Sequence, residues 1–280
     1  MNRTVPSFFL SFLMLVFSLF SCVVPDPEKV SSPYNHENQW RGKRVAFLGD
    51  SITDKRRVGT TKCYWEYLAE MLGLKPLVYG INGRQMSDIP DQAKQLKKEQ
   101  GDRTDAIIVF AGTNDYMAGI PIGEWYAETE DETLVGGPQK VMRKHRTFLM
   151  EDATFKGRIN LVMDYLKTNF PNRQIIFLTP LHRAQARFGD DNIQPEETFA
   201  NNAGLYIDDY VQAIKEAANV WAVTVIDLNS LSGLFPLNDS HTPFFAHPET
   251  DRLHPNAKGH YRMALTLKYQ LLALPAGFDE

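Results

Sequence analysis

A serine that directly follows an apolar segment is the first candidate for chemistry in this sequence. Ser51 lies in the segment 49–53 (GDSIT), immediately after the apolar run 44–48. A glycine permits a tight turn out of a strand, and the backbone N–H groups that follow can face the same space as the serine. This position suits a nucleophile. The segment is not Gly-x-Ser-x-Gly, so the nucleophile elbow of α/β-hydrolases is absent. A helix N-cap and a phosphate-binding loop are the alternatives.

A histidine near the C-terminus has a carboxylate at the right spacing to act as a base. In the segment 251–255 (DRLHP), Asp251 precedes His254 by three residues. One turn can bring the carboxylate to one ring nitrogen, which fixes the tautomer and leaves the other nitrogen to take a serine proton. His247 also precedes a proline, but the residue three before it is Phe244. His254 is therefore the better candidate.

Two further loops offer hydrogen-bond donors for an oxyanion. Asn114 lies in the segment 112–115 (GTND), where another apolar run ends. An asparagine amide there can donate to a developing oxyanion, and loss of such a donor costs on the order of a hundredfold in rate. The same residues also fit an Asx-turn. The glycines of the segment 80–84 (GINGR) can supply a backbone N–H, and they equally fit a plain turn.

The elements that must position these residues follow from the apolar pattern. Short, uninterrupted apolar runs of this kind are typical of parallel strands covered on both faces. Stretches with helical periodicity separate them, so the sequence predicts a doubly wound α/β sheet, whose ligands bind at the carboxyl ends of the strands. The predicted strands are 44–48, 76–79, 106–111, 174–179 and 223–228, and the predicted helices are 64–72, 155–166, 199–218 and 263–274.

Composition excludes other classes of protein. The chain has 280 residues, of which 43% are hydrophobic and 23% are charged, as in globular domains. Its formal charge of -4 leaves no basic field for phosphates, so a nucleic-acid partner is excluded. The two cysteines cannot form a disulfide framework, and Cys63 is expected to be a small buried apolar residue.

The first residues indicate export. The apolar run 8–20 is shorter than the roughly 20 residues of a membrane-spanning helix, and it follows a positive start, so residues 1–22 are interpreted as a signal peptide. The segment 19–22 (LFSC) resembles a bacterial lipobox, in which Cys22 would be lipidated. Residues 23–40 then form a proline-rich tether. We expect a lipid-anchored protein of the bacterial cell envelope, with ordinary secretion as the alternative.

Substrate contacts are expected from two places. The long insertion between Asp115 and Phe155 carries Trp125 and Tyr126, which can stack on a sugar at the rim of the site or can pack the insertion against the sheet. The other place follows the fourth predicted strand, where His182 and Arg183 either contact substrate or stabilise the loop.

Together, the segments around Ser51, Gly83, Asn114 and His254 resemble, in order and in strand placement, the four sequence blocks of the SGNH hydrolases, also called GDSL esterases/lipases. The resemblance covers roughly Lys43 to the end, and the predicted domain is 41–280. It implies a flavodoxin-like three-layer sandwich with a central five-stranded parallel sheet. Ser51 would be the nucleophile, His254 the base and Asp251 its orienter. The Ser51 and Gly83 N–H groups and the Asn114 side chain would form the oxyanion hole, with no metal or cofactor; Gly80 is the alternative to Gly83.

These expectations define an exported serine esterase that acts on short acyl esters, with an O-acetylated saccharide as the favoured substrate. Its activity should fall as the pH drops below the ordinary pKa of histidine. Contact with a membrane is expected only through the lipid anchor. The alternatives are an esterase or lysophospholipase of lipid acyl chains, a non-catalytic glycan-binding protein on a hydrolase fold, and a flavin-binding protein of the flavodoxin type.

Overall fold

The centre of the molecule is a five-stranded parallel sheet. The computed structural model describes residues 38–278, so the predicted signal peptide 1–22, with Cys22, and nearly all of the tether lie outside the described residues. The sheet has the order β2-β1-β3-β6-β9, with every neighbouring pair parallel. The predicted sheet is thereby confirmed. Its strands are β1 (Arg44–Gly49), β2 (Lys75–Val78), β3 (Ala106–Phe110), β6 (Gln174–Leu178) and β9 (Thr224–Ile226).

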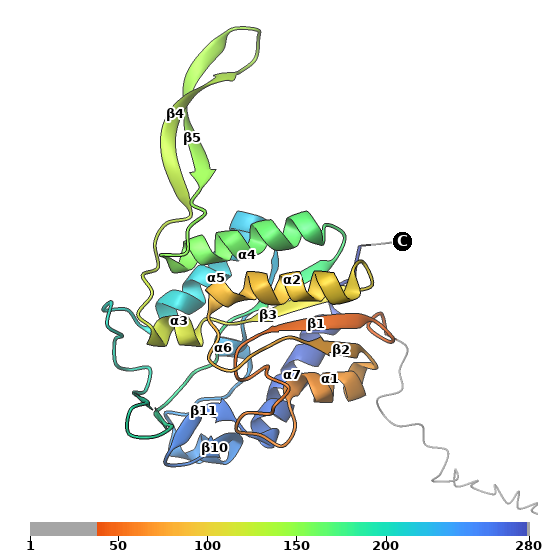
Figure 1. The fold of residues 1–280 in the computed structure, drawn as a ribbon, viewed down its shortest axis with the longest axis vertical. Helices are drawn as coiled ribbons and strands as arrows, with labels where there is room; N and C mark the ends of the chain where they lie inside the picture. The colour runs from red at the N-terminus through yellow and green to blue at the C-terminus, as the bar shows by residue number, and fades with distance from the viewer. Residues whose placement is uncertain (1–37, 279–280) are drawn as a thin grey trace, which may run out of the picture. The chain divides into compact units, whose positions relative to one another are not determined.

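Helices cover both faces of this sheet, so the predicted three layers are present (Figure 1). Side chains alternate along a strand, and along β1 they divide between two apolar cores. Ala46 and Leu48 belong to the core formed with α2, α4 and α5, whereas Val45 and Phe47 belong to the core formed with α1 and α7. The helices are α1 (Tyr64–Leu72), α2 (Ile89–Gln100), α4 (Phe155–Asn169), α5 (Ile207–Trp221) and α7 (Ala257–Leu272).

One predicted helix begins later than its apolar pattern indicated. A helix was expected over 199–218, but α5 begins only at Ile207. The side chain of Asn201 accepts hydrogen bonds from the N–H groups of Ala203 and Leu205, and Gly204 has a φ of +74°. These local side-chain contacts hold the chain in a turn and compete with the helix.

The insertion after the third central strand forms a projecting hairpin. Its strands, β4 (Tyr126–Leu134) and β5 (Lys140–Phe148), are antiparallel and mostly exposed, and they extend beyond α4 and α5 (Figure 1). Acidic residues of β4 face basic residues of β5; the carboxylate of Glu128, for example, lies 2.8 Å from the Nζ of Lys144. The acidic and the basic residues of the insertion are therefore on the two paired strands of one hairpin.

A second, smaller sheet carries the C-terminal histidine. Its order is β10-β11-β7-β8, and its three pairings are antiparallel. The sheet joins the segment after β6 to the segment before α7, so it lies beside the carboxyl end of the central sheet (Figure 1). The strands are β7 (Ala186–Arg187), β8 (Ile193–Gln194), β10 (Phe245–His247) and β11 (Asp251–Pro255).

The remaining elements are short. They are the helices α3 (Thr113–Met117) and α6 (Leu228–Leu231) and the 3-10 turns η2 (Met86–Asp88) and η3 (Asp239–Phe244). Cys63 is buried, as predicted, and burial raises the pKa of its thiol to about 12. Within residues 38–278, no helix has both the length and the apolar character needed to cross a membrane.

Candidate active site

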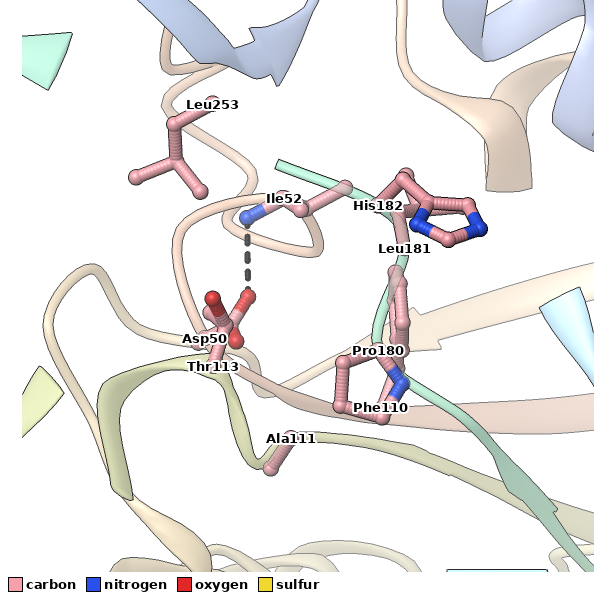
Figure 2. A pocket seen from close by; sticks show the side chains of 9 residues that line it. All are labelled: Asp50, Ile52, Phe110, Ala111, Thr113, Pro180, Leu181, His182 and Leu253. Atoms are coloured by element: carbon pink, nitrogen blue, oxygen red, sulfur yellow. Dashed lines mark hydrogen bonds between the residues drawn. The ribbon is translucent and has the colours of Figure 1, made fainter. Parts of the chain in front are cut away.

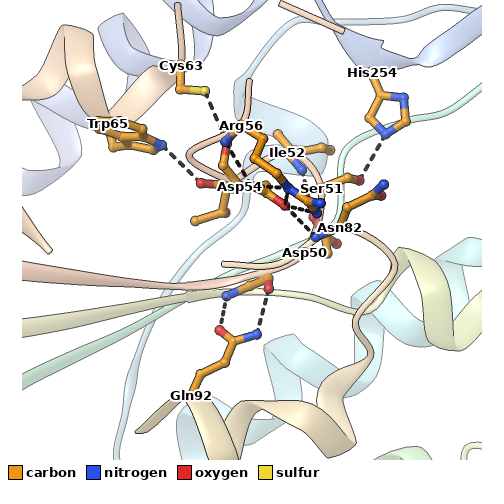
Figure 3. A network of polar contacts seen from close by, with 12 residues as sticks. Asp50, Ser51, Ile52, Asp54, Arg56, Cys63, Trp65, Asn82, Gln92 and His254 are labelled. Atoms are coloured by element: carbon orange, nitrogen blue, oxygen red, sulfur yellow. Dashed lines mark hydrogen bonds and ion pairs between the residues drawn. The ribbon is translucent and has the colours of Figure 1, made fainter. Parts of the chain in front are cut away.

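The turn that presents Ser51 is held tightly at the end of β1. A side chain on Gly49 would place its Cβ 2.3 Å from the carbonyl oxygen of Phe110, so only glycine fits between β1 and β3 at this point. The amide of Gln92, on α2, accepts a hydrogen bond from the Gly49 N–H at 2.8 Å and donates one to the Gly49 carbonyl at 2.9 Å. Figure 3 shows this paired contact beneath the turn. The backbone is therefore fixed on both sides just before Ser51.

Ser51, His254 and Asp251 form a chain of hydrogen bonds. The Oγ of Ser51 lies 2.9 Å from the Nε2 of His254, and the Nδ1 of His254 lies 2.9 Å from the carboxylate of Asp251 (Figure 3 shows the first contact). A carboxylate only accepts, so Nδ1 carries the proton and Nε2 is left to accept from the serine hydroxyl. This arrangement activates a serine for nucleophilic attack.

Asp251 and His254 are three residues apart in β11, so a single strand supplies two of the three groups in this chain of hydrogen bonds. The other oxygen of Asp251 accepts the backbone N–H groups of Leu253 at 3.2 Å and His254 at 3.0 Å. The carboxylate is thus held against its own backbone while it orients the imidazole. The side chains of Ser51 and His254 are both buried, so their contact is sheltered from water. Sheltering strengthens the electrostatic contacts among the three groups.

The candidate oxyanion donors come from neighbouring loops. Asp54, at the end of the Ser51 turn, accepts the backbone N–H of Asn82 at 2.8 Å, which attaches the Gly83 loop to this turn (Figure 3). The side-chain amide of Asn114 donates to the carbonyl of Arg84 at 2.9 Å. An amide has two N–H groups, so the second remains for a ligand. Ser51, Gly83 and Asn114 are thereby brought to one edge of the sheet.

The structure distinguishes the two glycines of this loop. A Cβ on Gly80 would lie 2.7 Å from the side chain of Thr53, so Gly80 serves close packing against the Ser51 turn. Gly83 is exposed and has a φ of +79°, and a Cβ at this position would have no neighbouring atom within 4 Å. Its backbone is open to a ligand, which favours Gly83 as the donor.

A buried ion pair fastens the loop of Asn114 to the loop of Gly83. Arg158, on α4, donates to the carboxylate of Asp115 at 2.8 Å and to the side chain of Gln85 at 2.7 Å. The second oxygen of Asp115 accepts the backbone N–H of Met86 at 2.9 Å. One carboxylate thus connects three segments of the chain. The ion pair fixes the distance between the two loops that carry candidate donors.

A small cavity lies beside the Ser51 turn (Figure 2). It has room for about one water molecule, roughly 10 Å³. The carboxylate of Asp50 lies in its wall and accepts the backbone N–H of Ile52 at 3.0 Å. Burial raises the pKa of Asp50 to about 7, although the hydrogen bond from Ile52 and the charge of His254 lower it. The lining residues are Asp50, Ile52, Phe110, Ala111, Thr113, Pro180, Leu181, His182 and Leu253.

The predicted aromatic contacts lie away from this cavity. The indole of Trp125 is nearly buried and donates to Glu216 of α5 at 2.9 Å. The ring of Tyr126 packs on Phe148, which stacks on Trp221 of α5. Both residues therefore pack the base of the projecting hairpin against a helix, and neither lines the cavity.

The two residues after β6 have different surroundings. His182 lines the cavity, and its Nδ1 lies 2.6 Å from the carboxylate of Glu197, whose hydrogen bond raises the pKa of the imidazole. Arg183 is buried and donates to the hydroxyl of Thr113 and the side chain of Gln194. Arg183 thus stabilises the loop, and only His182 faces the cavity.

Three residues that contact the candidate active site could not be identified from the sequence. Gln92 lies in an ordinary amphipathic helix, and nothing local indicates that it binds the backbone of Gly49. Gly59 lies directly behind His254, and Phe188 lies beside the same imidazole with ring centroids 5.4 Å apart. The neighbours of these three residues can be identified only in the folded structure.

In residues 38–278, no group of three or more histidine, cysteine, aspartate or glutamate side chains is arranged to hold a metal ion.

Comparisons with known proteins agree with this geometry. The model of the GDSL-like lipase/acylhydrolase family matches residues 47–262, which contain Ser51, Asn114, Asp251 and His254. No curated protein matches the chain.

Solved structures are similar in fold. One is a protein from Lactobacillus plantarum, with 24% identity and a TM-score of 0.63 over 83% of this chain and 98% of that one. Another is a possible lipase from Chitinophaga pinensis, with 20% identity and a TM-score of 0.59 over 82% and 99%. A third is a mutant acetyl-xylooligosaccharide esterase from Geobacillus, with 16% identity and a TM-score of 0.50 over 85% and 97%. These similarities show the fold, and the family match shows more: the chain belongs to the GDSL-like lipase/acylhydrolase family, whose members are carboxylic ester hydrolases.

Proposed function

We propose that this protein is a serine esterase that removes short acyl groups, above all acetyl groups, from a saccharide. The observation that carries the proposal is the chain of hydrogen bonds from Ser51 through His254 to Asp251, each step 2.9 Å long. The non-catalytic alternative requires a decayed site, and this constellation is intact.

The reaction follows from the positions of these groups. His254 takes the hydroxyl proton of Ser51 as the serine oxygen attacks the ester carbonyl, and the candidate donors at Ser51, Gly83 and Asn114 stabilise the oxyanion. When the intermediate collapses, the bond to the leaving alcohol breaks and His254 returns the proton to that alcohol. Water then attacks the acyl-serine by the same path, which releases the acid and restores the serine. Asp251 stays ionised throughout and stabilises the imidazolium.

Two observations support a short acyl group on a saccharide. The cavity beside the Ser51 turn is small, with room for about one water molecule, which favours a short acyl group over a long one. One of the proteins with the same fold acts on acetylated xylooligosaccharides. A lipid esterase is the second candidate because the family name includes lipases.

We further propose that the protein is exported and anchored in the bacterial envelope through Cys22. The proposal rests on the apolar run 8–20 and on the lipobox-like segment 19–22. Metabolic labelling of the full chain in a bacterium with an alkyne fatty acid tests it. The expected result is label in the wild type and in Cys63→Ala but none in Cys22→Ser. Label that persists in Cys22→Ser would exclude lipidation at this position.

A fluorophosphonate probe tests the nucleophile, because it reacts covalently with an activated serine. Wild type and the control Ser240→Ala should be labelled and should hydrolyse p-nitrophenyl acetate, whereas Ser51→Ala should do neither. Labelling of Ser51→Ala at the wild-type rate would reject Ser51 as the nucleophile. The folding of Ser51→Ala is checked by circular dichroism.

Substrate class is tested with the same enzyme preparation. Rates on p-nitrophenyl acetate should exceed those on p-nitrophenyl octanoate by about tenfold or more, since one methylene group is worth roughly tenfold or more in a shaped pocket. Acetate release from acetylated xylan should exceed fatty-acid release from a lysophospholipid. The reverse order would favour the lipid esterase.

A further inference from the structure

An exposed aromatic ring stands beside the base of the candidate active site. Phe188 is 43% exposed, although large apolar side chains are usually buried. Its ring centroid lies 5.4 Å from that of His254, with the two planes at 57°. Phe188 does not line the enclosed cavity beside the Ser51 turn. Its ring therefore offers an apolar surface to solvent next to the candidate base.

The ring is held in this place by the sheet that carries the base. Phe188 directly follows β7, and β7 pairs with β11 in the register Ala186↔Asp251. The N–H of Arg187 donates to the carbonyl of Thr250 at 2.8 Å. The N–H of Phe188 donates to the carbonyl of Asn192 at 2.9 Å and closes the turn between β7 and β8. Phe188 is therefore attached to the strand of Asp251 and His254 through backbone hydrogen bonds.

The mechanism places the leaving alcohol on this side of the site. The Nε2 of His254, which lies 2.9 Å from the Oγ of Ser51, must return its proton to the leaving oxygen. That oxygen therefore comes within hydrogen-bond distance of Nε2, at about 3 Å. A ring attached to the oxygen is then within reach of Phe188, whose ring centroid lies 5.4 Å from that of the imidazole. The acyl group points elsewhere, because its carbonyl oxygen must face the donors at Gly83 and Asn114.

The turn next to Phe188 has groups suited to hydroxyls. Asp190 and Asp191 are exposed at the tip of the β7–β8 hairpin and offer carboxylate oxygens as acceptors. Asp190 is paired with Arg187 at 2.5 Å, which leaves the turn with both an acceptor and a donor for hydroxyl groups. A planar apolar face beside such groups matches a sugar ring, which has an apolar C–H face and a rim of hydroxyls.

We propose that Phe188 and the β7–β8 turn form the subsite that binds the leaving group, and that this subsite takes a neutral saccharide ring. The inference rests on the proposed esterase function and names its alcohol-side specificity. Phe188 contacts the substrate by stacking, and it takes no part in proton transfer.

Steady-state kinetics on two acetate esters test the subsite. Tetra-O-acetyl-xylopyranose presents a ring, and ethyl acetate presents a small chain to the same catalytic groups. Phe188→Ala should lower kcat/KM for the sugar acetate by about fivefold to tenfold, mainly through KM, since one aromatic contact has that worth. The loss on ethyl acetate, which presents no ring to Phe188, should be clearly smaller than the loss on the sugar acetate. Phe188→Trp should retain or improve the rate on the sugar, because it keeps a stacking face.

The control is Phe278→Ala, which removes another exposed ring near Asn172, just before β6 and at the opposite end of the central sheet. It should leave both substrates unchanged. An equal loss on both esters in Phe188→Ala would show that Phe188 only shields His254, and no loss on the sugar would show that the ring binds elsewhere; either result overturns the subsite. Failure of the esterase function is recognised separately, since the wild type would then neither hydrolyse ethyl acetate nor react with fluorophosphonate.

Discussion

Gly59 lies directly behind His254, so closely that a Cβ on residue 59 would come within 2.7 Å of the Cβ of the histidine. The loop that carries Gly59 follows the Ser51 turn, and it packs against the Cβ and Cγ of His254. Gly59 also has a φ of +72°, which glycine adopts without the steric cost of a side chain. His254 thus contacts both the serine turn and the loop that follows it.

Gly59→Ala should consequently displace His254 from Ser51. We expect kcat for p-nitrophenyl acetate to fall by about a hundredfold, because a misplacement of roughly 1 Å has an effect of that size. KM should change little. Gly42→Ala is the matched control, since Gly42 has a φ of +77° but open space around a Cβ. Both variants carry similar backbone strain, and equal kcat values in the two would contradict a role for the contact with His254.

Asp251→Asn tests the orientation of the base. An amide can still accept from the backbone N–H groups of Leu253 and His254, so the strand should stay folded. It no longer stabilises the imidazolium, and it favours the wrong tautomer of His254. We expect kcat to fall by about 10⁴-fold, as in the analogous substitution of other triads. Stopped assays of acetate release measure this loss, and a loss below about tenfold would show that Asp251 is dispensable, given that size of effect.

The ionisation of Asp50 should make the free energy of unfolding depend on pH. Asp50→Asn should remove this contribution. Burial raises the pKa of Asp50 from 3.8 to about 7. Between these pH values the folded chain holds a proton that the unfolded chain releases, so the free energy of unfolding falls as the pH rises. Above pH 7 the reduction in the free energy of unfolding is constant, with an upper limit on the order of 4 kcal/mol.

The asparagine variant keeps an acceptor for the N–H of Ile52 and cannot ionise. Its stability relative to wild type should therefore be unchanged near pH 4 and should rise until about pH 7, as linkage requires. Urea unfolding at pH 4, 5, 6, 7 and 8 measures this difference. A difference that is flat across the series would show that Asp50 titrates at its ordinary pKa.

The buried pair of Asp115 and Arg158 should be costly to break. Burial raises the pKa of Asp115, although the hydrogen bond from Arg158 lowers it, so the carboxylate depends on its partner. Arg158→Met leaves this group unpaired and should lower the free energy of unfolding by about 3 to 5 kcal/mol. The double variant Asp115→Asn/Arg158→Met should regain part of the loss. Urea unfolding measures these free energies. A value for Arg158→Met within about 1 kcal/mol of wild type would refute the expectation, because a loss that small is typical of an exposed ion pair.

The projecting hairpin should be removable without loss of catalysis. Tyr126 and Phe148 are paired across its base, so residues 127–147 can be replaced by a two-residue Asn-Gly turn. Trp125 and its bond to Glu216 are retained. We expect kcat/KM for p-nitrophenyl acetate to stay within about twofold, since exposed loops tolerate deletion. A loss of activity in a folded variant would place the hairpin at the rim of the site after all.

The sequence by itself determined the sheet, the order of its loops and the local pair of Asp251 and His254. Apolar runs must be buried on both faces, and this requirement fixes strands such as β3 and β6 without knowledge of their neighbours. A spacing of three residues is equally local, because one turn of backbone joins the carboxylate to the imidazole. The family resemblance supplied the expected roles of Ser51 and Asn114.

Only the tertiary structure decided which distant side chains support these groups. Gln92 binds the backbone of Gly49, and Gly59 lies behind His254, across separations that no periodic pattern records. Trp125 was expected at the rim or in the packing of the insertion, and the structure places it in the packing. Such contacts depend on how helices and loops dock on the sheet. Docking is set by the shapes of many side chains at once, so local sequence determines the elements and not their neighbours.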